Sequence, residues 1–115
     1  MKKTIPVNVA TEELAQRLSE EVDCIIPLTH QSIPDDRLLT QKAHGLNIPI
    51  ILGGHDHSPH FEVHEHSVLL KSGMDSERVF IIDFVWKKED HMPAMYVRCE
   101  DCRTEAPHPY VQEAV

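Results

Sequence analysis

The sequence has few basic residues and no long apolar segment. Its 11 lysines and arginines stand against 19 acids, and they never form a group larger than an adjacent pair. Binding to the phosphate backbone of a nucleic acid needs clustered basic residues, so we expect no nucleic-acid partner. No apolar run approaches the roughly 20 residues that a bilayer-spanning helix needs. We therefore expect no membrane association and a cytoplasmic location.

Cysteine is also scarce. The three cysteines are Cys24, Cys99 and Cys102, and Cys24 lies within an apolar run. This odd number fits reduced thiols better than a disulfide framework. Cys99 and Cys102 form a single CxxC motif, but a zinc ribbon would need a second pair and a redox CxxC usually begins a helix. We interpret this motif as structural, with metal or redox chemistry as the alternative.

Internal repeats and low-complexity segments are absent as well. With 115 residues, 41% hydrophobic and 26% charged, the chain has the composition of one globular domain with a modest core. Residues 102–115 contain Pro107 and Pro109 and show no periodicity, so we expect a loose carboxyl-terminal tail there.

The first half of the chain predicts a strand, a helix and a strand. A preceding helix is expected over 11–21, with Thr11 as its N-cap. The apolar run 22–28 predicts a buried strand, which Pro27 would interrupt or place at a sheet edge. A helix over 32–45 and a strand over 48–52 follow. This order predicts a βαβ unit with parallel strands, and hence an α/β fold.

The second half predicts antiparallel strands over 67–71, 78–87 and 93–100. In the middle one, alternation places Phe80, Ile82, Phe84 and Trp86 on one face. An apolar stripe of this size needs a partner that covers it.

Histidines follow both strands of the predicted βαβ unit. His30 follows the first strand, and His55 and His57 follow the second after Gly53-Gly54. Neighbouring parallel strands lie roughly 5 Å apart and end at one edge of the sheet, where ligands of open α/β sheets usually bind. Three neutral imidazoles at one edge suit a transition-metal ion. The alternative is that they are loop histidines without a function.

These residues also carry a family resemblance. The strings LTH and GGHDH, each after an apolar strand, and the following VLLKSGMD resemble the closing motifs of the calcineurin-like metallophosphoesterases, most closely the 5'-nucleotidase branch. The resemblance covers roughly residues 22–86. It implies a two-sheet sandwich with outer helices and a site where two divalent ions, such as Mn, Zn, Fe or Co, activate water to hydrolyse a phosphate ester or nucleotide.

The resemblance also implies roles for individual residues. His30 and His55 would bind one metal ion and His57 the other. Asp56 would orient a neighbouring imidazole or backbone group rather than bind metal directly.

The sequence departs from the family in one large respect. The Asp-x-His, Gly-Asp and Gly-Asn-His motifs that complete the family's site occur nowhere in the chain. We therefore expect residues 1–101 to form the carboxyl-terminal half of the sandwich, inactive alone, which self-associates or pairs with the missing half. The alternative is a noncatalytic interaction or metal-binding module that retains the fold.

A second group of histidines lies in HFEVHEH. If this segment is a strand, His64 and His66 share one face and, with His60, form a second metal-binding tract. The alternative, which we favour, is that the three are solvated loop residues.

Overall fold

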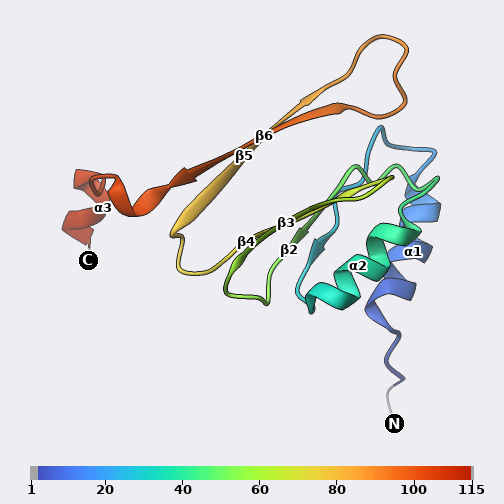
Figure 1. Ribbon diagram of the computed structural model, residues 1–115. Coiled ribbons are helices and arrows are strands. Elements are labelled where there is room, and N and C mark those ends of the chain that lie inside the picture. Colours follow the sequence, from blue (N-terminus) through green and yellow to red (C-terminus); the bar gives the residue numbers. More distant parts are fainter. Residues whose placement is uncertain (1–2, 115) are drawn as a thin grey trace.

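A four-stranded mixed sheet forms the centre of the molecule (Figure 1). The computed structural model describes residues 3–114, and side chains as far as residue 111. The strands lie in the order β1 (Leu28–Thr29), β2 (Ile50–Gly53), β4 (Val68–Ser72) and β3 (Pro59–Val63). β2 is parallel to both β1 and β4, whereas β3 pairs with β4 in the antiparallel direction.

The predicted βαβ unit is confirmed. α2 (Ile33–Lys42) connects β1 to β2, and the two strands pair in parallel with Leu28 opposite Leu52. Ser32 caps α2 by accepting a hydrogen bond from the Asp35 amide, as the sequence predicts. The first strand is much shorter than predicted. Pro27 lacks an amide hydrogen, so the ladder before β1 is reduced to isolated bonds such as Leu52 N to Pro27 O, at 3.0 Å.

The first helix begins earlier than predicted. α1 spans Val7–Leu18 and starts directly after Pro6, whose φ of −54° already suits a helix. Thr11 is therefore inside the helix, and our assignment of it as the N-cap was wrong. Its hydroxyl instead donates to the Val7 carbonyl at 2.8 Å, a bond that only an interior helical position allows.

Different elements pack on the two faces of the sheet. α1 and α2 pack on one face around Leu39, Ile51 and Leu69. The hairpin of β5 (Arg78–Val85) and β6 (Ala94–Asp101) packs on the other. Its apolar residues that meet the sheet are Phe80, Ile82, Phe84, Met95 and Val97. The chain's own sheet therefore covers most of the predicted apolar stripe, although Trp86 stays 42% exposed.

The fold is thus mixed α/β, with a small mixed sheet and an antiparallel hairpin. β3 forms in a segment that we had favoured as loop. The expected loose tail contains a short 3-10 helix, η1 (Cys102–Thr104), and α3 (Pro109–Ala114), which stands away from the sheet in Figure 1. Cys24, Cys99 and Cys102 are free thiols.

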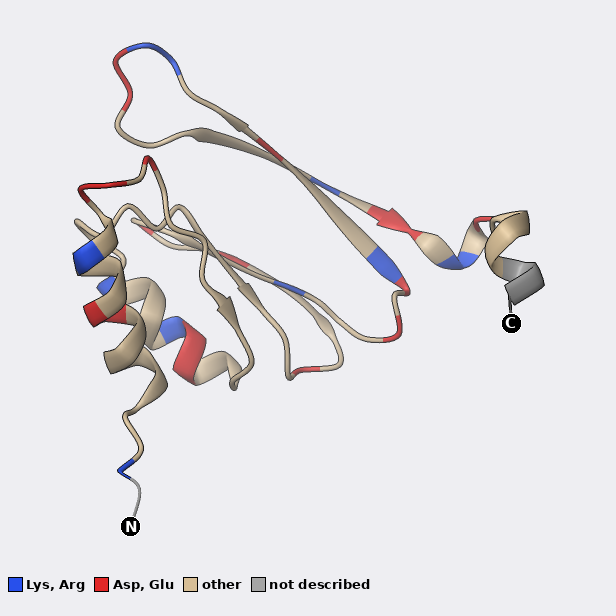
Figure 2. Cartoon of the chain, turned by 180° about the vertical axis from the view of Figure 1, so that it is seen from behind, with Lys and Arg blue, Asp and Glu red and all other residues tan. Residues whose placement is uncertain are grey.

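The basic residues are distributed along the chain. In the part of the chain that the structure describes, Lys and Arg occur on the helices, the sheet and the hairpin, with the adjacent pair Lys87-Lys88 in the connection between β5 and β6 (Figure 2). None of the helices among the described residues is long and apolar enough to span a bilayer.

Candidate functional site

His30 and His55 meet at the carboxyl ends of β1 and β2. Their ring centroids are 5.3 Å apart and the planes stand at 83°. Both side chains are exposed, so a ligand can reach them from solvent. The structure brings these two predicted residues together because parallel strands in register end at the same edge of the sheet.

Gly54 allows the two strand ends to come this close. Its amide donates to the Thr29 carbonyl at 2.8 Å. A Cβ atom at this position would lie 3.1 Å from Nδ1 of His30. The following residue, His55, has a φ of 73°, in the left-handed region. The glycine therefore leaves room for the His30 ring, and the turn after it presents His55 to the same edge.

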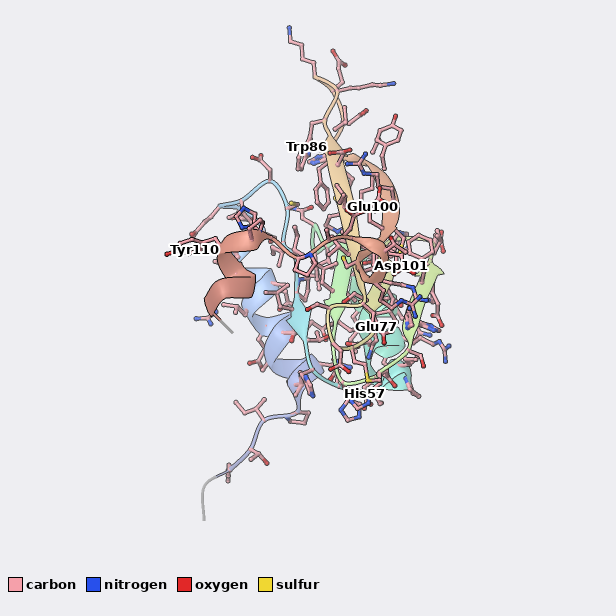
Figure 3. All side chains as sticks on the ribbon, turned by 90° about the vertical axis from the view of Figure 1, so that its left-hand side faces the viewer. His57, Glu77, Trp86, Glu100, Asp101 and Tyr110 are labelled. Carbon is pink, nitrogen blue, oxygen red and sulfur yellow. The ribbon has the colours of Figure 1, made fainter. Side chains whose placement is uncertain are left out.

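His57 does not complete a three-imidazole site. It is exposed at the end of the sheet (Figure 3). Within residues 3–111, no three His, Cys, Asp or Glu side chains are arranged to hold a metal ion. The predicted ligands thus form one pair with a third residue outside it.

Asp56 is engaged by a lysine. Its Oδ2 accepts a hydrogen bond from Lys71 Nζ at 2.5 Å. This bond lowers the pKa of Asp56 against the opposing effect of burial. The resemblance implied that Asp56 positions a neighbouring group. The group it contacts is the Lys71 ammonium, which in turn donates to the backbone carbonyl of Gly54 at 2.9 Å.

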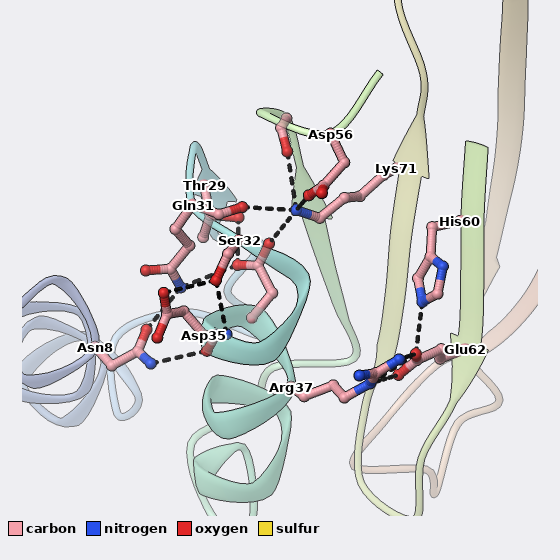
Figure 4. A network of polar contacts seen from close by, with 12 residues as sticks. Asn8, Thr29, Gln31, Ser32, Asp35, Arg37, Asp56, His60, Glu62 and Lys71 are labelled. Carbon is pink, nitrogen blue, oxygen red and sulfur yellow. Dashed lines mark hydrogen bonds and ion pairs between the residues drawn. The ribbon is translucent and has the colours of Figure 1, made fainter. Parts of the chain in front are cut away.

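Lys71 joins the elements that carry the histidines (Figure 4). It lies at the end of β4 and is 1% exposed. Its ammonium donates to the Gln31 carbonyl, at 2.7 Å, and lies 2.9 Å from Asp36 Oδ2. Burial favours a lower pKa for Lys71, but the carboxylates of Asp56 and Asp36 outweigh it and the pKa is raised. Lys71 therefore stays charged and ties the end of β1 to the loop after β2.

Asp36 is the buried counter-charge. It lies in the first turn of α2 with no exposed surface. Oδ1 accepts from Thr29 Oγ1 at 2.7 Å and from Gln31 Nε2 at 3.0 Å. Oδ2 has no aligned hydrogen-bond donor, so its 2.9 Å contact with Lys71 Nζ is an ion pair by distance alone. Thr29 and Gln31, which flank His30, are thus held in place by the buried carboxylate of Asp36.

Gly53 fits against this buried pair. A Cβ atom there would lie 2.8 Å from both Asp36 Oδ2 and Lys71 Cε, closer than real Cβ contacts come. The first glycine of GGHDH is therefore needed to admit the Lys71 side chain, and the second to admit the His30 ring.

The sequence analysis missed Lys71 and Asp36. A usable signal was present, since Lys71 ends the apolar run Val68–Leu70 on a strand that is buried on both faces. A lysine at such a position needs carboxylate partners nearby.

The second histidine group lies partly on a strand, and not only in loops as we favoured. His60 and Glu62 belong to β3, and His64 follows it. Both imidazoles contact Glu62, with His60 Nε2 at 2.5 Å and His64 Nε2 at 2.8 Å. The Arg37 guanidinium also binds Glu62 and holds the pKa of that carboxyl at about 2. His64 and His66 lie in the loop after β3, so the continued strand on which their predicted pairing depended does not form, and the loop placement that we favoured holds for these two.

The chain was compared with known proteins in three ways. No protein-family model, no curated protein and no solved structure matches it.

Proposed function

We propose that this chain supplies the histidine ligands of a metal-dependent phosphate-ester hydrolase site. The observation that supports this most is the pairing of His30 and His55 at the carboxyl edge of the sheet. Both rings are exposed on adjacent strand ends, and imidazole is a ligand type that suits transition-metal ions. The glycine turn and the resemblance of LTH and GGHDH to metallophosphoesterase motifs point to the same chemistry.

His30 and His55 would hold one divalent ion, such as Mn, Zn, Fe or Co, and His57 would serve a second. Such ions polarise a phosphoryl oxygen and lower the pKa of bound water when they occupy a site of this type. Lys71 keeps Asp56 and the backbone of the GGHDH turn in place, which holds the imidazoles near each other. The proposed substrate is a phosphate ester, with nucleotides as the first class to test.

Further ligands have to come from another polypeptide segment. Asp56 is already bound to Lys71, and among residues 3–111 no third ligand stands beside the His30–His55 pair. Tight binding of a divalent ion needs more donors and more negative charge than two neutral imidazoles provide. We therefore expect the chain alone to bind metal weakly and to hydrolyse phosphate esters slowly or not at all.

A noncatalytic module with the same fold is the second candidate. The observation that favours it is the commitment of Asp56 to Lys71, which leaves no third metal ligand beside the two histidines among residues 3–111. In that case the chain would act through its surfaces and hold at most one weakly bound ion.

The test is a titration of the full chain with Zn(II), followed by NMR of the histidine rings. We expect the His30 and His55 ring signals to shift together, and the response to disappear in His30→Ala and in His55→Ala. His108→Ala, remote in sequence, is the matched control. If neither ring responds at millimolar metal, the proposal is wrong.

A phosphatase assay separates the two candidates. The chain is incubated with p-nitrophenyl phosphate or a nucleoside monophosphate in the presence of Mn(II), Co(II) or Zn(II). Metal-stimulated hydrolysis that is lost in His55→Ala supports the enzyme. Metal binding at His30 and His55 without any hydrolysis favours the noncatalytic module.

A further inference from the structure

A second pair of imidazoles lies at the opposite end of the sheet. His44 follows the C-cap of α2, and His66 lies just before β4 begins. Their ring centroids are 4.3 Å apart, with the planes at 50°. His30 and His55 lie beyond the carboxyl ends of β1 and β2, whereas His66 precedes the amino end of β4. The two pairs are therefore separate.

His44 and His66 line a cavity of about 340 Å³ together with a third histidine. The third is His91, in the connection 86–93 between β5 and β6. The full lining is Ala43, His44, Gly45, Asn47, His66, His91 and Met92. It contains three imidazoles and a thioether, but no Lys, Arg, Asp or Glu that would compete for the histidines.

This pair differs from the two histidines that contact Glu62. The ring nitrogens of His60 and His64 already contact Glu62. His66 Nε2 lies 3.8 Å from Glu65 Oε2, which is beyond hydrogen-bonding distance but near enough to favour a cation. An imidazole not held by a carboxylate can turn its nitrogen toward an ion.

We propose that His44, His66 and His91 form a binding site for a transition-metal ion of the Zn, Ni or Cu class. Neutral imidazoles are common ligands for these ions, and the neighbouring Met92 sulfur is a soft donor that copper would also accept. The site is independent of the function proposed above, because it shares no residue with the His30–His55 edge.

His91 has to move toward the pair for this site to form. The three imidazoles do not converge on one point in the present arrangement. His91 is exposed, and its connection, residues 86–93, is turn and irregular backbone with all residues exposed apart from Met92 and Pro93. Metal binding would therefore fasten the tip of the hairpin to the carboxyl end of α2, and the bound ion would stabilise the folded chain by mass action.

The experiment uses the full chain with His30→Ala and His55→Ala, so that the other candidate site is removed. Zn(II) is titrated in competition with a chromophoric indicator, and Co(II) absorption reports the ligand type. We expect one Zn(II) per chain in this background. Adding His44→Ala, His66→Ala or His91→Ala should each weaken binding on the order of tenfold or more.

The controls distinguish the loss of a metal ligand from unfolding and from nonspecific metal binding. His44 and His66 are exposed, so far-UV and near-UV circular dichroism should not change when either is replaced. His108→Ala should leave the affinity unchanged. The proposal is overturned if replacing His44 and His66 has no effect, if His91→Ala has no effect, or if His60→Ala with His64→Ala abolishes binding instead. A negative result would not bear on the His30–His55 proposal, because both of those histidines are replaced by alanine in the protein used for this titration.

Discussion

Lys71 is a charged residue in the protein interior, where its ammonium group is removed from water. Its side chain and that of Asp36 have no exposed surface, and each alone would be strongly unfavourable in the core. The ammonium is satisfied by two carboxylates and two backbone carbonyls. Such a network contributes little net stability compared with apolar packing, but removing one member leaves the others uncompensated.

We predict that Lys71→Met destabilises the chain by about 3–5 kcal/mol, because Asp36 then becomes a buried charge without a counter-charge. Urea unfolding measures this directly. Lys42→Met is the matched control: Lys42 is half-exposed and pairs with Glu12 at 3.3 Å, and its loss should cost less than about 1 kcal/mol.

A double variant tests the reason for this loss. Lys71→Met combined with Asp36→Leu removes both buried charges and should recover a large part of the lost stability. If the single variant unfolds at the same urea concentration as the wild type, or if the double variant is no better than the single one, the buried ion pair is not the cause.

The position of a single residue could be predicted from the sequence where the local pattern determines it. It could not be predicted where contacts with residues distant in the sequence determine it. His30 and His55 could be placed at one edge because each follows an apolar strand. Asp36 carries the signature of an acid in the first turn of a helix, which is usually solvated. Only the fold shows that the helix turns this acid inward onto Lys71.

At the scale of elements, one carboxylate fastens α2 to the edge strand β3. Glu62 on β3 binds the Arg37 guanidinium of α2 through both carboxylate oxygens, with Nε at 2.7 and 2.9 Å. His60 and His64 flank the same carboxylate. In the described part of the chain β3 pairs only with β4, so this contact is a second attachment of the edge strand to the rest of the fold.

The stability of this attachment should depend on pH in a defined direction. The pKa of Glu62 is about 2 in the folded chain, below its ordinary value of 4.5. The stabilisation is therefore complete above about pH 4.5 and is lost as the pH falls toward 2. We expect about 1–2 kcal/mol, less than the full pKa difference implies, because Arg37 is 45% exposed and water screens the pair.

The measurement is urea unfolding of the wild type and of Glu62→Gln at about pH 5 and about pH 2. The wild type should lose more stability between the two conditions than the variant does. Asp101, whose pKa is also about 2, titrates in both proteins and cancels in the comparison. Equal losses in the two proteins would show that Glu62 does not hold β3 to α2.

Elements could be predicted where apolar periodicity is strong. The helix and second strand of the βαβ unit and both hairpin strands have such patterns and lie close to their predicted places, whereas the first strand is reduced to Leu28–Thr29. β3 was missed because its sequence, PHFEV, has polar residues facing Arg37 rather than an apolar core. The start of α1 was misplaced because Thr11 is a good N-cap by type, whereas Pro6 sets the actual entry into the helix.

The whole molecule exposes more surface than its mass predicts. Its accessible surface is 8606 Å². A compact monomer of 13.2 kDa should expose about 6,400 Å². The radius of gyration is 16.6 Å, whereas a compact domain of this length should have about 13 Å. The excess of roughly 2,000 Å² is larger than the roughly 800 Å² that each partner buries in a standard protein–protein interface.

The hairpin of β5 and β6 has unpaired edges and an apolar outer face. It is a layer of only two strands, so both of its long edges lack a neighbour in the described chain. Its inner face packs on the sheet, while its outer face carries apolar residues such as Val79, Val85 and Tyr96, the last 64% exposed. A strand from another polypeptide, or from a second copy of this chain, would pair with the free backbone N–H and C=O groups of these edges.

We predict that the chain is not a monomer at tens of micromolar, because association through the hairpin buries edges and apolar surface that folding leaves exposed. Sedimentation equilibrium should give a mass well above 13.2 kDa. Tyr96→Lys, on the outer face of β6, should shift the distribution toward the monomer, since a buried lysine is unfavourable. Gln16→Lys on α1 adds the same charge away from the hairpin and should leave the mass unchanged. A wild-type mass of one chain at these concentrations would refute association, and an equal effect of both substitutions would move the contact away from the hairpin.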